Sequence, residues 1–426
     1  MGITMLMIFG GLMALGVPIA VALGLGAMGA IFISGKYSTL AIIHKMIGSI
    51  DSFILLAIPF FVLAGQLMNT SGITDRIFRF AKSLVGHIPG GLAHANIIGS
   101  IIFSGMSGSA IADAAGLGQV EMKAMIDEGY DPEFSAAITA ASATVGPIIP
   151  PSIPMVLYGA MAEVSVGALF LGGFIPGLLL GVGMMILVYF ISIKRKYLKS
   201  NKFDLKEVWE SFKGAFLAII TPIIIIGGIL LGVFTPTEAA VVATVYAFVL
   251  GFIVYREMTL AILLKNLINA TVTTSSIIFI LSSAAAFSWV IALEGIPQAV
   301  TRFIQSTTQN PYMILLILNV VFLVLGMFME SLSILVITVP FLSPLIKSYG
   351  FDPVHIGVMV VLNLMLGLCT PPVGMSLFVC SKVGNIKLEK LYREILPFLV
   401  PLIAVLFIIA YVPVTVTFVP DLLLKR

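Results

Sequence analysis

Two carboxylates and several hydroxyls stand inside segments of this sequence that are otherwise apolar. The stretch SGMSGSAIADAAGLG, residues 104–118, holds Ser107 and Ser109 together with a single acid, Asp113. A second acid, Glu330, lies at another short break between apolar runs. An unpaired carboxylate is costly in apolar surroundings, so an acid in such a segment indicates a binding site by default. The alternative is that each acid caps the start of a helix, and this alternative is strongest for Glu330.

Two proline-rich segments interrupt apolar runs farther along the chain. They read TVGPIIPPSIP at residues 144–154 and LGLCTPPVG at residues 366–374. Each proline lacks an N–H donor and leaves a carbonyl group free about one turn earlier in the helix. Sodium binds oxygen ligands, so free carbonyls beside the hydroxyls of Ser107, Ser109 and Thr370 predict a cation site at each break. A pair of proline kinks without a ligand is the alternative, which the symmetry of the two segments disfavours.

The composition places these residues in a membrane. Apolar residues make up 59% of the chain and charged residues 10%, and the mean hydropathy is +1.14. A soluble domain is about a quarter charged, whereas apolar runs of about 20 residues, long enough to cross a bilayer, recur here along the whole length. We therefore expect an all-α polytopic membrane protein. The net charge of +3 does not indicate a nucleic-acid partner, and without a phosphate-binding loop we expect no ATP hydrolysis.

The apolar runs predict nine spans, of which the first is a single helix from Ile3 to Ile33. Residues 73–90 are amphipathic with one basic face, which predicts a helix in the membrane interface, and residues 296–309 form a weaker copy. The expected spans are residues 3–33, 51–70, 131–162, 165–193, 214–234, 237–255, 267–293, 352–381 and 395–418.

Basic residues orient the predicted spans. Residues 194–213 form the most basic segment of the chain, and residues 382–393 form a second basic cluster. Basic segments next to spans stay in the cytoplasm, so we expect both on that side of the membrane. Counting crossings then places the N-terminus in the cytoplasm and the C-terminus, with Lys425 and Arg426, in the periplasm.

Two pairs of apolar segments are too short to be spans. Residues 92–103 and 110–122 lie on either side of the first polar stretch, and residues 311–326 and 331–344 lie on either side of Glu330. About 12 residues of helix are about 18 Å long, against a hydrocarbon core of about 30 Å. We therefore expect two re-entrant helical hairpins. Irregular backbone at membrane depth must be buried in protein or reached by water, so each hairpin tip is expected to line a site.

Residues that set backbone geometry recur after 221 positions without a gap. An odd number of predicted spans separates equivalent points, so the two copies have opposite orientations in the membrane. Inverted repeats, broken helices and a site at the membrane midplane are the architecture of secondary transporters. The matched pairs are Gly105 and Gly326, Gly129 and Gly350, Asp131 and Asp352, Gly146 and Gly367, Pro150 and Pro371, Pro151 and Pro372, and Pro176 and Pro397.

This repeat divides the chain into a first copy at residues 1–193, a cytoplasmic basic loop with a linker helix at residues 194–234, and a second copy at residues 235–426. The first copy comprises frame helices 1–72, interfacial helix 73–90, hairpin 91–127, broken helix 131–162 and helix 165–193. The second contains hairpin 311–347 and broken helix 352–381.

Four polar residues outside the hairpin tips are expected to be structural. Asp131 and Asp352 each precede a proline, which predicts the start of a helix rather than a site. Cys369 and Cys380 fall in one apolar region, and we expect packed thiols there rather than a disulfide.

Several motifs together resemble a known family over essentially the whole chain. They are FSGMSGSAIADAAGLGQVEMKAM, GPIIPPSIPMVLYGA, LLGVFTPTEAAVVA, GMFMESL and LCTPPVGMSLF. They are similar to the large membrane subunit of tripartite ATP-independent periplasmic (TRAP) transporters, the DctM family. The resemblance implies an elevator-type, sodium-coupled importer of organic acids in the bacterial inner membrane. It also implies a soluble periplasmic substrate-binding protein and a small four-helix membrane subunit, here expected to be a separate polypeptide.

The resemblance also implies roles for individual residues. Asp113, Ser109 and Ser165 match positions expected near the substrate, which would be sialic acid, a C4-dicarboxylate or a sugar acid. One sodium site would use Ser107, Ser109, Gly146, Ile149 and Pro151, and the symmetric site would use Glu330, Gly367, Thr370 and Pro372.

Two alternatives to a binding-protein-dependent transporter remain open at this stage. A passive channel would carry substrate without sodium coupling and without saturation, and another ion-coupled transporter would work without a binding protein. An enzyme within the membrane would need a catalytic pair, and none is visible in the sequence, so we do not expect an enzyme.

Overall fold

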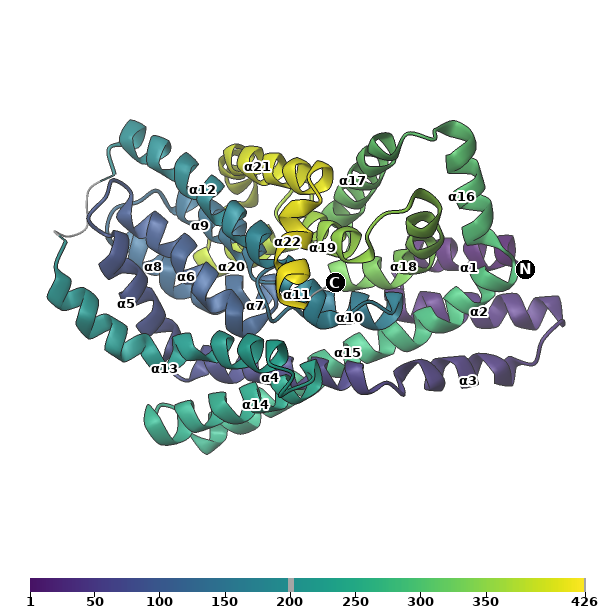
Figure 1. Cartoon of the computed structure of the whole chain (residues 1–426), viewed down its shortest axis with the longest axis horizontal. Helices are drawn as coiled ribbons and strands as arrows, with labels where there is room; N and C mark the ends of the chain where they lie inside the picture. The colour runs from purple at the N-terminus through teal and green to yellow at the C-terminus, as the bar shows by residue number, and fades with distance from the viewer. Residues whose placement is uncertain (198–202, 425–426) are drawn as a thin grey trace.

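The computed structural model describes residues 1–197 and 203–424, so Lys199 and Lys202 of the basic segment, together with Lys425 and Arg426, lie outside the described residues. The described part is helical and contains no strands (Figure 1). Eight of its helices are long and apolar enough to cross a membrane, which confirms the predicted all-helical, multi-span class. They cover Phe53–Thr70, Val166–Arg195, Leu205–Leu230, Pro236–Val254, Leu260–Leu293, Pro311–Phe328, Ser331–Tyr349 and Leu388–Tyr411.

The first apolar run is not a single helix, so the prediction of one span at residues 3–33 is wrong. It forms α1 (Gly2–Ala14) and α2 (Ile19–Ser34), which pack against each other. Gly16, with φ +77°, and Pro18, which cannot donate a backbone hydrogen bond, make the turn between them.

The last predicted span, residues 395–418, is likewise divided. The chain forms α21 (Leu388–Tyr411) and then α22 (Val414–Leu424), with Val412 and Pro413 between the two helices. The break falls at a proline, which ends helices because its ring clashes with the preceding turn.

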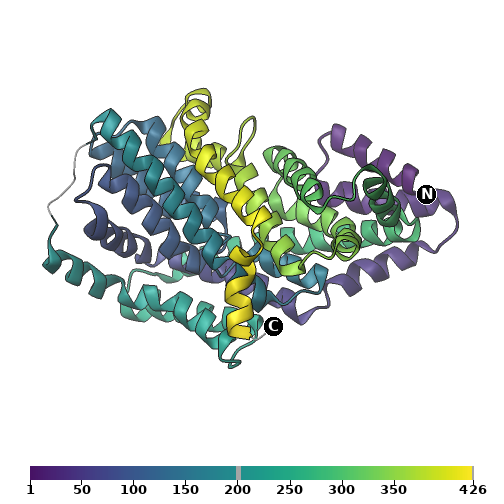
Figure 2. The same ribbon diagram turned by 45° about the horizontal axis from the view of Figure 1, so that its top comes forward.

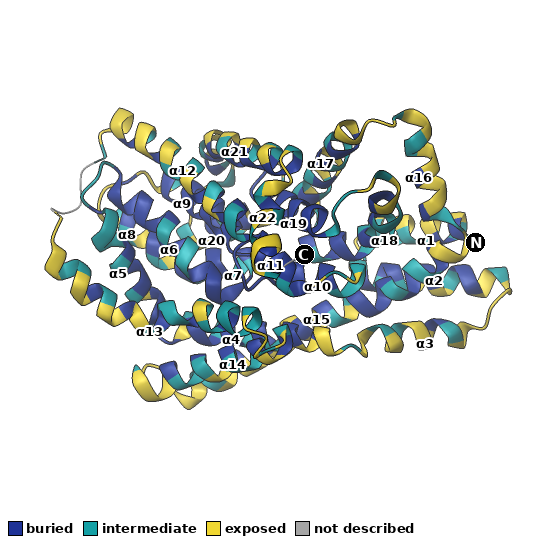
Figure 3. Ribbon diagram, viewed as in Figure 1, coloured by how far each residue is buried: buried dark blue, intermediate teal, exposed yellow. Residues whose placement is uncertain are grey.

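One group of helices lies along the lower side and at the right-hand end of the molecule in Figure 1. It consists of α1, α2, α3 (Thr39–Ile50), α4 (Ala57–Thr70), α13 (Leu205–Leu230), α14 (Pro236–Val249) and α15 (Leu260–Leu293), and we call it the frame. Helix α14 packs along α4, and α15 packs along α2, α3 and α4. The outer surfaces of α3, α13 and α14 are largely exposed (Figure 3), as expected of surfaces that face lipid or a partner.

Both predicted hairpins are present, with arms longer than the sequence indicated. The expectation that all four arms are too short to be spans is wrong for the second hairpin, because Pro311–Phe328 and Ser331–Tyr349 are each long and apolar enough to cross a membrane. The first consists of α6 (Gly91–Ser107), the short helix α7 (Ala110–Ala115) and α8 (Leu117–Asp127). The second consists of α17 (Pro311–Phe328) and α18 (Ser331–Tyr349). We call residues 107–113 the first tip and residues 329–333 the second tip.

Both predicted broken helices are also present, and they lie in the buried centre of the molecule (Figure 3). The first runs through α9 (Pro132–Ser142), a 3-10 turn (Ala143–Val145) and α10 (Ile153–Ala162). The second runs through α19 (Pro353–Leu368) and α20 (Met375–Gly384). We call residues 143–152 the first break and residues 369–374 the second break. The peptide bonds Pro150–Pro151 and Pro371–Pro372 are both cis.

The bounds of these elements repeat at the 221-residue spacing to within a few residues. Helices α6, α9 and α10 correspond in this way to α17, α19 and α20. The frame departs from this regularity, because α15 is one helix of 34 residues whereas its counterpart is divided into α3 and α4. Asp51 and Ser52 lie in the gap between these two helices.

The amphipathic segment forms helix α5 (Ile73–Val85), whose apolar residues Ile73, Ile77, Phe78 and Ala81 are buried. Its basic residues pair with other elements. Arg76 contacts Glu257 at 2.8 Å, Arg79 contacts Glu207 at 2.8 Å, and Lys82 contacts Glu128 at 2.5 Å. The weaker copy forms α16 (Ile296–Thr307).

The two aspartates before proline both stand at helix starts, as predicted. Asp352 caps α19 by accepting hydrogen bonds from the backbone N–H groups of Val354 (2.7 Å) and His355 (2.9 Å). Asp131, at the start of α9, instead accepts from Tyr197 (2.6 Å) and pairs with Arg195 (3.1 Å). The arginine also bonds Glu394 on α21 at 2.8 Å. This network joins α9 and α12 (Phe174–Arg195) to α21, which Figure 2 shows beside them.

Candidate functional site

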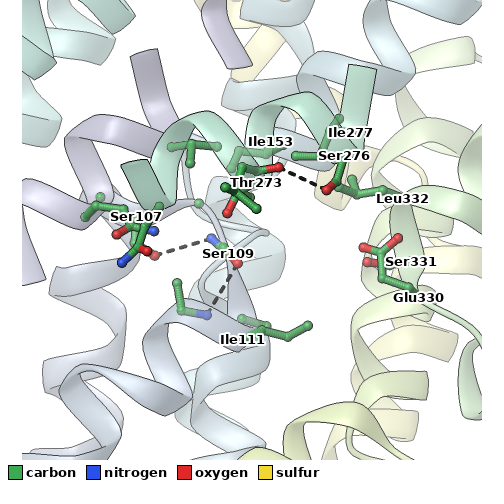
Figure 4. A pocket seen from close by; sticks show the side chains of 18 of the residues that line it. Ser107, Ser109, Ile111, Ile153, Thr273, Ser276, Ile277, Glu330, Ser331 and Leu332 are labelled. Carbon is green, nitrogen blue, oxygen red and sulfur yellow. Dashed lines mark hydrogen bonds between the residues drawn. The ribbon is translucent and has the colours of Figure 1, made fainter. Parts of the chain in front are cut away.

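A cavity of about 1220 Å³ lies between the two hairpin tips and the frame. Figure 4 shows residues of the first tip (Ser107, Ser109) and of the second (Glu330, Ser331), with α15 residues Thr273 and Ser276 from the frame. The start of α2, the C-terminal half of α4, and Pro147, Ile153 and Pro154 near the first break complete the wall. Residues from both repeats therefore meet around one space, as the sequence predicted for the tips.

The first tip rests directly on the first break. Gly108 adopts φ +65°, which favours glycine, and a Cβ atom there would stand 2.7 Å from the Pro151 carbonyl oxygen. The hydroxyl of Ser109 caps α7 by accepting from the N–H of Ala112 at 3.4 Å, and Ser107 Oγ accepts from the N–H of Ser109 at 3.3 Å. A side chain at position 108 would push the tip away from the break.

Asp113 is the last residue of the first tip, and it does not line the cavity. Its side chain is 2% exposed, and one carboxylate oxygen, Oδ1, accepts a hydrogen bond from the Ser107 hydroxyl. The other oxygen, Oδ2, has no hydrogen-bond partner. A Cβ atom built on Gly146 would collide with Oδ2, so the carboxylate faces the backbone of the first break. The structure thus brings Ser107, Asp113 and Gly146 together.

Glu330 lines the cavity and also caps a helix. Its Oε2 accepts hydrogen bonds from the backbone N–H of Ser333 at 3.0 Å and from the Ser333 hydroxyl at 3.2 Å, at the start of α18. The 221-residue spacing makes Glu330 the counterpart of Ser109, which caps α7 in the same way. Asp113, by contrast, corresponds to Ile334. The two acids therefore occupy different positions in the two repeats.

The second break is held by backbone contacts. A Cβ atom on Gly367 would stand 2.6 Å from Cα of Gly326, so α17 and α19 touch at these two glycines. The hydroxyl of Thr370 donates to the carbonyl of Leu366 at 2.7 Å. Pro372 is exposed, and its carbonyl accepts a hydrogen bond from the Tyr392 hydroxyl. The second break thus approaches its hairpin through glycine backbone rather than through a carboxylate.

The remaining predicted residues are more scattered. Ile149 and Pro151 are buried in the first break, away from the cavity lining. Ser165 caps α11 (Val166–Gly172) by accepting from the N–H of Ala168 at 3.3 Å. It is exposed and does not line the cavity.

A polar row on α15 faces the tips and was missed by the sequence reasoning. It consists of Lys265, Asn266, Asn269, Thr273 and Ser276, all of which line the cavity. Their spacing of three and four residues puts them on one side of a helix, and this pattern within an apolar run is the signal that could have revealed them. Among the described lining residues, Lys265 is the only cationic side chain and Glu330 the only acidic one.

The family model for the tripartite ATP-independent periplasmic transporter, DctM component, matches residues 6–415. The chain belongs to the DctM family. The resemblance seen in the motifs is therefore confirmed. A DctM chain is one component of a three-part transporter and not an enzyme, and its many apolar helices make it a multi-span membrane protein.

Relatives of this DctM chain are similar to it over nearly its full length. The sialic acid TRAP transporter large permease protein SiaM of Vibrio cholerae is 47% identical, covering 98% of this chain and 98% of that one. The sialic acid TRAP transporter permease protein SiaT of Haemophilus influenzae is 43% identical, covering 97% of this chain and 67% of that one. The C4-dicarboxylate TRAP transporter large permease protein DctM of Pseudomonas aeruginosa is 39% identical, covering 94% of each chain.

A solved structure shares the fold of the DctM chain. The YdaH transporter of Alcanivorax borkumensis aligns with a TM-score of 0.63 over 87% of this chain and 86% of that one, at 12% identity. At this level of identity the similarity concerns the fold alone.

Proposed function

We propose that this chain is the permease of a sodium-coupled importer that takes a small organic acid from a periplasmic binding protein. The observation that carries the proposal is the cavity between the two tips, with a cationic side chain and a row of hydroxyls and amides on its frame wall. Organic anions need such partners, because a carboxylate loses its hydration when it enters a cavity. The relatives named for sialic acid and for C4-dicarboxylates support the same substrate class.

Within that class we favour a polyhydroxylated acid such as sialic acid over a simple dicarboxylate or another sugar acid. The polar row offers one positive charge at Lys265, which matches one carboxylate, and several uncharged groups that match hydroxyls. The first tip adds the hydroxyl of Ser109 from the opposite wall. Since Asp113 and Ser165 do not line the cavity in this conformation, we keep Ser109 as the substrate contact among the three predicted residues.

Sodium would bind at the two breaks. At the first break the buried Oδ2 of Asp113, which has no partner, fits a cation held together with Ser107, Ser109, Gly146, Ile149 and Pro151. Hard cations prefer such oxygen ligands, and one would compensate the unpaired carboxylate. At the second break Thr370 retains oxygen lone pairs beside Gly367 and Pro372, with Glu330 at the tip.

The cavity extends toward the side that we assign to the cytoplasm, and we propose that it opens there. It follows α15 from Ile280 to Ile262, near the N-terminal end of that helix. At this end Glu257 pairs with Arg76 on α5, and Arg79 on the same helix pairs with Glu207 in the basic segment. Basic segments are retained in the cytoplasm, so this conformation would release substrate inward. We propose an elevator motion in which the hairpins and broken helices move against the frame.

The other components follow from the same proposal. Exposed apolar side chains on α13, such as Trp209 (57%) and Ile223 (64%), offer the frame a surface for the small four-helix membrane subunit or for lipid. The binding protein would deliver substrate on the periplasmic side of the inner membrane. In this arrangement the N-terminus lies on the periplasmic side, because the amino group of Met1 pairs with Glu294 at the C-terminal end of α15 at 3.6 Å. This differs from the cytoplasmic position expected from counting spans, whereas the C-terminus stays periplasmic.

The proposal is tested by uptake into proteoliposomes that contain the permease with its small subunit. Candidate acids are supplied with the binding protein, with and without an inward sodium gradient. We expect saturable uptake that needs both. Uptake without saturation or sodium would indicate a channel, and uptake without the binding protein would indicate another type of ion-coupled transporter.

A matched pair of variants tests the cavity assignment. Lys265→Gln removes the positive charge from the cavity wall, and Lys45→Gln removes an exposed lysine of the frame that does not line the cavity. Losing a hydrogen bond to a charged group costs about 1.5–3 kcal/mol, so Lys265→Gln should weaken apparent substrate affinity by at least about tenfold. Equal affinities of the two variants would contradict the assignment.

A further inference from the structure

Glu121 is a buried acid that the proposed transport mechanism does not use. It lies on α8, in the second arm of the first hairpin, and is 0% exposed. Neither of its carboxyl oxygens has a hydrogen-bond partner. The carboxyl group of Glu121 lies close to the backbone of α6, because a Cβ atom built on Gly99 would stand 2.8 Å from Oε1. The carboxyl is therefore enclosed by protein on the inside of the hairpin.

No cationic side chain among the described residues forms an ion pair with Glu121. The titratable groups that interact with it are Asp113 on α7 and the thiol of Cys380 on α20. Glu121 therefore interacts with a second acid and a thiol, and with no counter-charge among the described residues.

The other described polar groups on the helices packed around α8 form no ion pair with Glu121. Asn96 on α6 bonds Thr139 (2.8 Å) and Ser142 (2.6 Å) on α9. The charged residues of α5 and α9 form ion pairs elsewhere, and His94 on α6 is buried without a partner. The paired residues are Arg76 with Glu257, Arg79 with Glu207, Lys82 with Glu128 and Glu133 with Lys390, while Asp75 and Lys382 are exposed.

An ionised carboxylate in such a place has lost its hydration without gaining a partner, whereas a neutral acid avoids most of that cost. We propose that Glu121 is a proton-binding site, whose carboxyl holds a proton while the first break is without a cation and releases it when a cation binds there. The release step rests on the proposed sodium site at the first break. The protonated state rests only on the surroundings of Glu121.

The link between the two sites is electrostatic. Asp113 and Glu121 lie eight positions apart across the junction of α7 and α8, which corresponds to a helical rise of about 12 Å. A positive charge arriving beside Asp113 favours the ionised form of Glu121. At an effective dielectric constant of about 20, a unit charge at that distance changes the proton-binding constant of Glu121 about tenfold. By reciprocity, protonation of Glu121 weakens cation binding by the same factor.

The test is infrared difference spectroscopy on the purified full-length permease in lipid bilayers, recorded before and after sodium replaces potassium. A protonated carboxyl gives a C=O band that is separate from the carboxylate bands and shifts in D2O. We expect such a band in potassium and its loss in sodium. Glu121→Gln should lower the intensity of the band by the share of one carboxyl group, since the buried Asp113 can also contribute to it, whereas Asp127→Asn, which changes an exposed acid on the same helix, should leave the intensity unchanged.

A second measurement uses the unaltered protein, in case Glu121→Gln folds poorly. Sodium added to the permease in weakly buffered solution should release up to about one proton per chain, as reported by a pH-sensitive dye. A carboxyl band of undiminished intensity in folded Glu121→Gln, or no proton release from the unaltered protein, would overturn the proposal. Sodium-driven uptake is measured in parallel. Uptake that does not depend on sodium would refute the proposed function. The carboxyl band recorded in potassium would still test whether Glu121 is protonated.

Discussion

The contact between Gly326 and Gly367 sets how closely the second hairpin approaches the second break, and Gly367→Ala tests its importance. Both residues lie in helices, and no unusual backbone angle prevents alanine at position 367. The effect of the substitution therefore depends on whether there is room for the alanine methyl group. The new methyl group would stand 2.6 Å from two backbone atoms of Gly326 and 2.9 Å from its carbonyl oxygen. Backbone cannot rotate aside as a side chain can, so α17 must move away from α19.

The size of the effect follows from that geometry. Ordinary contacts between carbon atoms are about 3.5–4.0 Å, so the helices must separate by about 1 Å. Overpacking of this kind lowers the free energy of unfolding by about 1–3 kcal/mol, and the higher helix propensity of alanine raises it by about 1 kcal/mol at most. We expect a net loss of stability of about 1–2 kcal/mol. Because the displaced residues flank the proposed cation site, a shift of about 1 Å should lower sodium-driven uptake by up to about 100-fold.

The assay is the sodium dependence of initial uptake in proteoliposomes, with thermal unfolding of the purified permease measured alongside. Gly214→Ala on α13 is the matched control, because a Cβ atom there meets nothing within 4 Å. That variant should keep normal uptake and gain about 0.5–1 kcal/mol of stability. If Gly367→Ala showed the sodium dependence and melting temperature of the control, the close approach would not be a constraint on the site.

Three further outcomes are expected. Ser109→Ala should cost about 1 kcal/mol through loss of the α7 cap and should lower uptake, whereas Glu330→Gln should keep its cap and lower uptake only; normal uptake by both would remove the tips from the site. The hydrogen bond from Lys390 lowers the pKa of Glu133 from 4.5, so this pair stabilises the fold above that value and the contribution is lost as pH falls through the lowered pKa. Glu133→Gln should therefore show a smaller loss of melting temperature in acid than the unaltered protein. An equal fall of melting temperature with decreasing pH in the two proteins would contradict the pairing. Ala110→Cys, in a protein without Cys369 and Cys380, should change its labelling by a membrane-impermeant thiol reagent when sodium and substrate are added, and constant labelling would argue against movement of the first tip.

The hairpins and breaks could be predicted from the sequence because glycine, serine and proline interrupt apolar runs at those places, and because the interruptions recur after 221 residues. The turn between α1 and α2 carried the same signal in Gly16 and Pro18, but apolar residues on both sides concealed it. The lengths of the hairpin arms were underestimated for a related reason. Small polar residues near the tips continue the helix when protein surrounds them, although they break an apolar pattern.

The site was only partly predictable. Ser109 and Glu330 were expected at the two hairpin tips, and both line the cavity and cap the helix that leaves their tip. Spacing could not indicate that Asp113 turns toward Gly146 rather than toward the cavity, because a side chain's direction depends on which neighbour lies behind the helix. The polar row on α15 was missed because its importance depends on which face of that helix meets the tips. That is a property of tertiary packing.

The length of α15 has a consequence for the lipid around the protein. A helix of 34 residues is about 51 Å long, well beyond a hydrocarbon core of about 30 Å, and most of its residues are apolar. Such a helix must tilt strongly or thicken the surrounding bilayer. Since α15 also carries the cavity row from Lys265 to Ser276, a change in its tilt would shift that row relative to the hairpin tips. We therefore expect the transport rate to depend on the acyl-chain length of the host membrane.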